Sequence, residues 1–185
     1  MIEHEKQAEE MKPLDFSRFP HEVVVDEEVV LSDFASEDAS RLEEITQDEA
    51  SRTYIEWTKE DKTAYIERTT RSRDGRGPRY AIRYNGELVG HLAIFPSPDV
   101  LGVIEIGYLL SGEFRGNGIV ARTLPIGEGL VRAHMPRMKV GLCINDANGP
   151  SKRVAERAGF MPTETISDGD RLYLKMGDHD QAAAS

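Results

Sequence analysis

The segment from Ile104 to Val120, which reads IEIGYLLSGEFRGNGIV, constrains the fold of this chain more than any other. In its first part every second residue is apolar, and the residues between them are also largely nonpolar, which predicts a strand buried on both faces. A turn follows, and Arg115-Gly-Asn-Gly118 then precedes a helical pattern. Two glycines before a helix let the backbone approach an anion, and the free amides of the first helical turn favour its charge. The segment therefore predicts a pyrophosphate cradle, with a plain glycine turn as the alternative.

Length and composition narrow the class of protein. A chain of 185 residues with 39% hydrophobic and 30% charged residues predicts one globular domain. The net charge of −10 argues against a nucleic-acid partner and is compatible with a cationic substrate. One cysteine, Cys143, excludes an intrachain disulfide framework. Because no apolar run has the length of a membrane span and the first residues are acidic, we expect no membrane partner and a cytoplasmic protein.

The two ends of the chain differ from its middle. Residues 1–22 are polar and acidic, which predicts a flexible or loosely docked N-terminal arm. Phe16 and Phe19 are exceptions that would anchor the arm either on the domain or on a second subunit, so a homodimer is left open. The predicted domain covers residues 23–177, and residues 178–185 are expected to form a frayed tail.

Turn and cap signals order the elements between these ends. Asn85-Gly86 predicts a hairpin of strands 80–84 and 88–95. Pro125 predicts a kink in the helix that follows the glycine loop, or a late start of that helix. The other predicted elements are strands 23–25, 29–31, 139–144 and 171–176, helix 37–47 capped by Ser36, a helix from Thr58 and Asp61 to about residue 70, helix 119–134, and helix 151–158 ended by Gly159. The basic loop 71–79 is either solvated or a contact to a phosphate or an acidic surface.

Three blocks of sequence carry a family resemblance. Glu105-Ile-Gly-Tyr-Leu-Leu110, Arg115-Gly-Asn-Gly-Ile-Val120 and the segment 148–160, which reads NGPSKRVAERAGF, resemble in this order the GNAT superfamily of acyl-CoA N-acyltransferases. Within it they resemble the RimJ/RimL-type ribosomal-protein N-terminal acetyltransferases, and Trp57 fits that branch. The resemblance covers residues 23–176. It implies an α/β (α+β) fold, with a mixed, mostly antiparallel central sheet flanked by helices on both faces and open after its fourth strand.

The resemblance also implies acetyl-CoA as cosubstrate and a set of residues that bind it. Residues on the strand would follow the pantetheine, the glycine loop would hold the pyrophosphate, and the last two residues would meet the thioester end. The implied cofactor-binding residues are Ile106, Gly107, Tyr108, Leu109, Leu110, Arg115, Gly116, Asn117, Gly118, Ile119, Val120, Asn148 and Ser151.

Amine acylation requires a group that removes a proton from the amine, and the resemblance assigns this role to Glu105. The alternative is a carboxylate at the end of a strand that faces solvent. Family members often hold an acidic Tyr where this chain has Ala155, so Ser151 is the candidate proton donor, with helix capping as its alternative. Cys143 lies in an apolar run and is predicted to be a core residue, which favours direct transfer without a covalent intermediate.

The remaining polar residues support no other chemistry. Tyr65 and Tyr108 would line an amine pocket or, by default, pack in the core. The five histidines are scattered, so no metal site is predicted. The sequence thus predicts an N-acetyltransferase that moves an acetyl group from acetyl-CoA to a primary amine, either a protein N-terminus or a small cationic molecule. The alternatives are a non-catalytic acyl-CoA-binding or sensing module and a nucleotide-binding protein that uses the glycine loop.

Overall fold

A computed structural model describes residues 14–48, 62–71, 76–167 and 169–175. Several sequence predictions fall outside these ranges. They are the arm up to residue 13, the helix start at Thr58 and Asp61, Trp57, residues 72–75 of the basic loop, and the tail.

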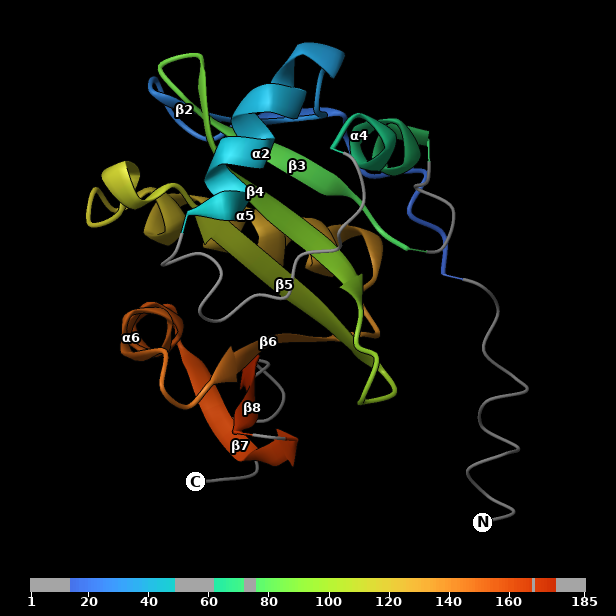
Figure 1. The fold of residues 1–185 in the computed structure, drawn as a ribbon. Coiled ribbons are helices and arrows are strands. Elements are labelled where there is room, and N and C mark those ends of the chain that lie inside the picture. Colours follow the sequence, from blue (N-terminus) through green and yellow to red (C-terminus); the bar gives the residue numbers. More distant parts are fainter. Residues whose placement is uncertain (1–13, 49–61, 72–75, 168, 176–185) are drawn as a thin grey trace.

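Eight strands form one sheet (Figure 1), with the order β1-β2-β3-β4-β5-β6-β8-β7. All neighbouring strands are antiparallel except β5 and β6, which are parallel. The prediction of a mixed, mostly antiparallel sheet is therefore confirmed. The strands are β1 (Glu22–Val24), β2 (Val29–Ser32), β3 (Arg79–Tyr84), β4 (Glu87–Pro96), β5 (Val103–Leu110), β6 (Lys139–Asn145), β7 (Phe160–Ser167) and β8 (Asp170–Lys175).

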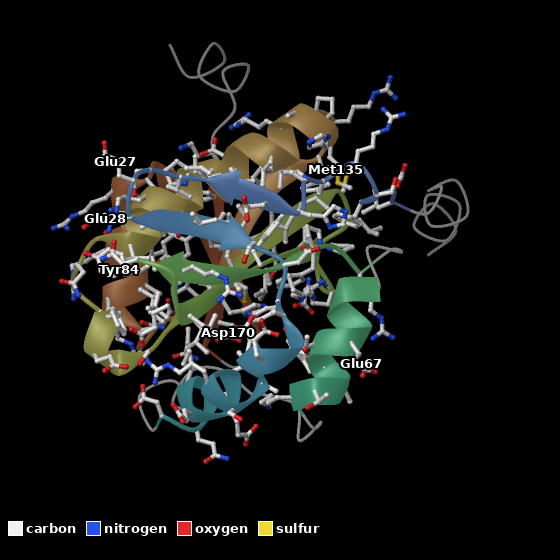
Figure 2. All side chains as sticks on the ribbon, turned by 90° about the horizontal axis from the view of Figure 1, so that it is seen from above. Glu27, Glu28, Glu67, Tyr84, Met135 and Asp170 are labelled. Carbon is white, nitrogen blue, oxygen red and sulfur yellow. The ribbon has the colours of Figure 1, made fainter. Side chains whose placement is uncertain are left out.

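Helices cover both faces of this sheet, as Figures 1 and 2 show. Helices α2 and α4 pack on one face, where Leu42 and Tyr65 belong to a small apolar cluster with Leu109 of β5. Helix α5 packs on the other face against the main core, so closely that a Cβ on Gly127 would meet Ile106. The helical elements are η1 (Ser36–Asp38), α2 (Ala39–Gln47), α4 (Lys62–Arg71), η2 (Gly112–Phe114), α5 (Ile119–His134) and α6 (Gly149–Arg157). Within the described residues, no helix has the length and apolar character needed to cross a membrane.

Turn chemistry fixes the β3–β4 hairpin where the sequence predicts it. Asn85 and Gly86 both have positive φ, 50° and 83°, as a two-residue type I′ turn requires. The pairing of β3 with β4 shifts in register between Ile82 and Arg83. The hairpin places β4 in the sheet between β3 and β5.

Three local predictions need correction. The predicted helix 37–47 begins instead as the short η1, because Asp38 Oδ2 accepts the backbone N–H of Ala35 at 2.8 Å in place of a cap by Ser36. Helix α5 starts at Ile119 and continues through Pro125, so a late start is wrong. Strand β7 was not predicted. Its sequence FMPTETIS lacks apolar alternation and contains Pro162, which an edge strand tolerates.

The core extends into the segment that the sequence analysis assigned to the arm. Phe16 and Phe19 are 0% and 1% exposed and belong to the main core cluster. Tyr80 Oη donates a hydrogen bond to the carbonyl of Pro20 at 2.8 Å. Of the two anchoring sites considered for these phenylalanines, the structure shows the domain itself.

Strands β5 and β6 are joined over only three residue pairs. Val103 pairs with Lys139, Ile104 with Val140 and Glu105 with Gly141. Beyond these pairs β5 continues to Leu110 beside β4, whereas β6 continues to Asn145 beside β8. The two strands therefore separate after Glu105, and Figure 1 shows β6, β8 and β7 turning away with α6.

Candidate functional site

A cavity of about 470 Å³ lies where β5 and β6 separate, within the size range of small-molecule sites. The end of β5, the glycine loop with the start of α5, and α6 form its walls. Its lining residues are Tyr108, Leu109, Leu110, Arg115, Gly116, Gly118, Ile119, Val120, Ala121, Pro125, Asn148, Pro150, Ser151, Val154, Arg157 and Ala158.

Most of the predicted cofactor-binding residues meet at this cavity. Ile106, Gly107 and Asn117 do not line it. Ile106 packs in the core beneath α5, and Gly107 faces the Phe95 ring. The sequence motifs do not predict six further lining residues, which reach the cavity by helical periodicity from those motifs: Ala121, Pro125, Pro150, Val154, Arg157 and Ala158.

The outer end of the cavity is built from backbone. Gly116 and Gly118 have φ values of 82° and 71°, which other residues adopt at a cost. Gly118 is the N-cap of α5 and has no side chain to cap it, and the first helical hydrogen bond runs from Arg122 N–H to Gly118 C=O at 3.1 Å. The preceding amides of α5 thus remain available to an anion, together with the positive end of the helix dipole.

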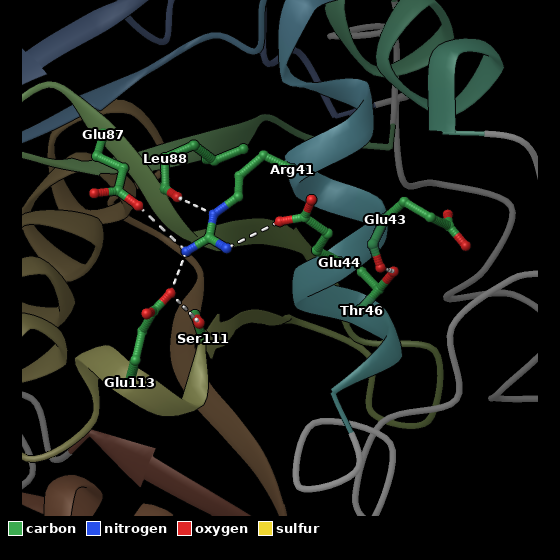
Figure 3. Close-up of polar contacts among 8 residues, drawn as sticks. All are labelled: Arg41, Glu43, Glu44, Thr46, Glu87, Leu88, Ser111 and Glu113. Carbon is green, nitrogen blue, oxygen red and sulfur yellow. Dashed lines mark hydrogen bonds and ion pairs between the residues drawn. The ribbon is translucent and has the colours of Figure 1, made fainter.

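Helix α2 holds this outer end through Arg41 (Figure 3). The guanidinium of Arg41 forms an ion pair with Glu113 of η2 and donates to Glu87 at 3.3 Å and to the carbonyl of Leu88 at 3.3 Å. Ser111 Oγ also donates to Glu113, at 3.3 Å. The turn that leads into the glycine loop is therefore attached to an element about seventy residues earlier, a link that the sequence analysis did not predict.

Arg115 is a second link between α2 and the loop. Its guanidinium donates to the carbonyl of Leu110 from Nε at 3.2 Å and from Nη2 at 3.1 Å, and it pairs with Asp48 Oδ2 at 3.3 Å. Arg115 lines the cavity as predicted, but these contacts direct its charge toward the protein. Its position fixes the end of β5 relative to the loop.

The inner end of the cavity is built from side chains of α6 and β5. Asn148 is the N-cap of α6, and its Oδ1 accepts the N–H of Ser151 at 3.2 Å. The capping role considered for Ser151 is therefore wrong, because Ser151 lies inside the helix. Ala155, at the position of the usual acidic Tyr, is completely buried in the main core.

Tyr108 brings a hydroxyl to this inner end. Its oxygen is buried and has no hydrogen-bond partner among the described residues. Burial raises the pKa of the phenol. The nearby Ser151 side chain lowers that pKa, although its distance and angle to the phenol do not meet those of a hydrogen bond. Buried hydroxyls are rarely left unpaired in this way.

Glu105 lies three residues earlier on β5 and is only 4% exposed, so the alternative of a solvent-facing carboxylate is wrong. Ser97 Oγ donates to its carboxylate at 2.5 Å. Burial is the main cause that raises the pKa of Glu105, the Ser97 hydrogen bond lowers it, and the charges of Asp99 and Asp170 raise it further. Glu105 is thus a buried carboxylate with an increased affinity for a proton.

Glu105 and Tyr108 point to opposite faces of β5, because side chains alternate along a strand. Gly107, with the parity of Glu105, faces Phe95, whereas Tyr108 packs against the core beneath α5. A complete sheet would separate these two groups. Here the β5–β6 ladder ends at Glu105, so no β6 residue pairs with β5 at Tyr108.

Cys143 on β6 is exposed, so its prediction as a core residue is wrong. Val140, Leu142 and Ile144 alternate with it and point into the main core, which places Cys143 on the opposite face. Partial desolvation of the thiol and the charges of Glu105, Asp170 and Asp99 nevertheless raise the pKa of Cys143 to about 12. Tyr65 is buried and contacts His91 Nε2 at 3.2 Å, consistent with its default role in packing.

Comparisons with known proteins agree with this geometry. The family model described as "Acetyltransferase (GNAT) domain" matches residues 28–161. A Bacillus subtilis protein, YdaF, whose name marks it as a candidate ribosomal N-acetyltransferase, is 29% identical over 107 residues. That match covers 58% of this chain and 57% of the relative, so it spans little more than half the relative's length.

Two solved structures share the fold at low sequence identity. RimL, a ribosomal alpha-N-protein acetyltransferase in complex with coenzyme A, is 18% identical with a TM-score of 0.71, over 86% of this chain and 99% of that one. MccE, a self-immunity acetyltransferase in complex with acetyl-CoA and AMP, is 20% identical with a TM-score of 0.67, over 85% of this chain and 97% of that one.

Proposed function

Since the chain belongs to the GNAT acetyltransferase family, we propose that it transfers an acetyl group from acetyl-CoA to a primary amine, with Glu105 as general base. One observation carries this proposal. A cavity with a backbone anion cradle at its outer end runs along the end of β5, and Glu105, a buried carboxylate outside the lining, lies on the same strand where its pairing with β6 ends.

The cavity fits the chemistry of acetyl-CoA along its length. The amides of α5 and the positive-φ glycines suit a pyrophosphate. The β6-facing edge of β5 beyond Glu105, which pairs with no other described strand, suits the amides of a pantetheine arm. Asn148, Ser151 and Tyr108 supply polar atoms at the inner end, where the thioester would lie.

Glu105 is suited to remove the proton that an ammonium group must lose before it attacks. A base works best when its pKa lies closer to the working pH than that of an ordinary carboxylate, and burial raises the pKa of Glu105 in that direction. The amine would approach from the α2 and α4 face, which bears Glu105. The nitrogen attacks the acetyl carbonyl carbon, the C–N bond forms, and the C–S bond breaks with its electron pair on sulfur.

Direct attack on the thioester is preferred to a covalent enzyme intermediate. Cys143 is exposed on the same face as Glu105, but a thiol with a pKa of about 12 is almost wholly protonated at neutral pH and is a poor nucleophile. Direct transfer is therefore preferred because the Cys143 thiol stays protonated, and not because Cys143 is buried in the core.

The acceptor is proposed to be cationic in its resting form, either a protein N-terminus or a small amine. Asp99 and Asp170 act on Glu105 through their charges, so the approach to the base is negatively charged. The net charge of −10 also attracts a cationic acceptor at long range.

Titration calorimetry with acetyl-CoA followed by free-thiol release over a panel of amines and N-terminal peptides tests this function. We expect acetyl-CoA to bind and at least one acceptor to release CoA. Glu105→Gln should then lower kcat about 10²–10⁴-fold at neutral pH. Glu164→Gln, an exposed carboxylate on β7, is the matched control and should leave kcat unchanged.

The outcomes separate the alternatives. Binding of acetyl-CoA without thiol release from any acceptor would favour an acyl-CoA sensing module. An unchanged kcat for Glu105→Gln between about pH 6 and about pH 9 would remove Glu105 from the mechanism while leaving the activity in place.

A further inference from the structure

We propose that the Tyr108 hydroxyl donates a hydrogen bond to the sulfur atom of bound CoA and stabilises the thiolate that leaves in the reaction. This inference rests on the proposed function and assigns a catalytic role to a residue on β5. The reason for it is that Tyr108 lines the cavity and that its buried hydroxyl has no hydrogen-bond partner among the described residues.

The location of Tyr108 selects the ligand atom. The phosphate end of the cavity lies at Gly116–Gly118, and Tyr108 lies at the other end with Ser151 of α6. Glu105, the proposed base, is three residues away on the same strand and on the opposite face. The acetyl carbon must be reached by the amine from the Glu105 face, so its sulfur substituent is directed to the face that bears Tyr108.

The other polar side chains that line this end are those of Asn148 and Ser151. Ala155 has no polar atom and is completely buried. Asn148 Oδ1 accepts the backbone N–H of Ser151 in the cap of α6, which holds the side chain in place and leaves its Nδ2 group as a second donor beside Tyr108. Ser151 Oγ lies near the phenol without completing a hydrogen bond to it, so it can orient the phenol once a ligand is bound.

The protonation state of Tyr108 agrees with this role. Burial raises the pKa of the phenol, so the hydroxyl remains protonated at neutral pH and can act as a donor. An ordinary thiol has a pKa of about 8.5, well below that of a phenol, so Tyr108 keeps its proton and stabilises the sulfur anion by hydrogen bonding. The proton lost by the amine passes to Glu105 and then to water, and water protonates the released thiolate.

The test uses CoA and desulfo-CoA, which lacks the sulfur atom, and needs no acceptor. For the full-length protein, the pKa of bound CoA thiol is measured from thiolate absorbance between about pH 6 and about pH 10. We expect binding to the unmodified protein to lower it by about one unit, which equals about tenfold tighter binding of the thiolate than of the thiol. Tyr108→Phe should abolish most of that shift and leave the affinity for desulfo-CoA within about twofold.

A stability measurement provides a second readout that a packing role would not produce. Tyr108→Phe removes an unpaired buried hydroxyl and should maintain or raise the Tm of the ligand-free protein. Tyr80→Phe is the matched control, because its hydroxyl donates to Pro20 C=O at 2.8 Å outside the cavity. It should lower the Tm by about 2–4 °C and leave the bound thiol pKa unchanged.

Three results would overturn the inference. If Tyr108→Phe leaves the bound thiol pKa unchanged, the hydroxyl does not contact sulfur. If Tyr108→Phe weakens the binding of CoA and of desulfo-CoA equally, the hydroxyl contacts another part of the cosubstrate. If the unmodified protein binds neither, the proposed function fails first, and this is recognised before any variant is compared.

Discussion

The outer and inner ends of the cavity are built in different ways. The outer end is the glycine loop and the start of α5, where backbone amides face the cavity and the ion pairs of Arg41 and Arg115 hold the loop from outside. At the inner end Tyr108 lines the cavity and Glu105 lies three residues earlier on the same strand, outside the lining, and burial raises the pKa of both side chains. Binding at the outer end should therefore depend on backbone shape, whereas chemistry at the inner end should depend on single functional groups.

The largest effect on binding is expected for Gly118→Val. A Val Cβ would crowd the ligand, and a β-branched residue is strained at φ 71°, so we expect the Kd for acetyl-CoA to rise tenfold or more, about 1.4 kcal/mol. Asn117→Ala should change the Kd within about twofold, since Asn117 does not line the cavity. Calorimetry measures both.

Gly118→Asn separates the two causes in this prediction. Asn tolerates the left-handed region, and apart from the adjoining backbone no atom of the described residues lies within 4 Å of a Cβ at Gly118. A near-normal Tm with weak binding would assign the effect to obstruction of the ligand. If Gly118→Val leaves the Kd within about twofold, the loop does not hold the pyrophosphate, and the contrast between the two ends fails.

Arg115→Ala should have a smaller effect, about three- to tenfold on the Kd. The arginine fixes the end of β5 through Leu110 C=O, so its loss should disturb the loop indirectly even if it touches no phosphate. Arg115→Lys keeps the charge but loses the two-pronged contact. Equal affinity of Arg115→Lys and the unmodified protein would instead favour a direct, charge-only role.

For the inner end, Glu105→Gln should stabilise the protein while it removes activity. A folded-state pKa above the ordinary value of 4.5 means that the folded protein holds this proton more tightly than the unfolded chain. The ionised Glu105 therefore costs stability as the pH rises through that folded pKa, and Gln avoids this cost. We expect a Tm about 1–3 °C higher at neutral pH, allowing for solvent screening, and no difference below about pH 4. A lower Tm at neutral pH would contradict the shift.

The smallest effect is expected for Arg41→Gln. Its ion pairs with Glu113 and Glu87 are largely exposed, and such pairs contribute little to stability. We expect a two- to threefold weaker Kd for acetyl-CoA at low salt and a smaller difference at high salt. A large, salt-independent loss would mean that the loop is held by α2 more firmly than the contacts in Figure 3 indicate.

The sequence predicts local features of this molecule better than distant contacts. Asn85-Gly86 specifies its hairpin by backbone conformation alone, and the glycine loop identifies the outer end of the cavity for the same reason. The ion pair of Arg41 with Glu113 joins residues far apart in the chain, so no local pattern contains it. Strand β7 exists because β8 pairs with it, although FMPTETIS has no strand pattern of its own.

The inner end shows a second limit. The sequence identifies Glu105 and Tyr108 as candidate site residues. Their surroundings on the two faces of β5 depend on where β6 stops pairing with that strand. The apolar neighbours of Cys143 on its strand predict a core residue, but only the sheet shows which face of β6 is exposed. Burial changes the pKa of these groups, and burial follows from tertiary packing.

The short β5–β6 junction has a consequence for exchange with solvent. From Ile106 onward, β5 keeps β4 as a neighbour, but no strand among the described residues pairs with its other edge. Amide hydrogens on that edge should exchange with deuterium faster than those of the β3–β4 hairpin, because opening them breaks no pairing between strands. When acetyl-CoA occupies the cavity, its pantetheine would take the place of the missing strand, and slower exchange confined to Ile106–Leu110 and the start of α5 would trace the ligand along the protein.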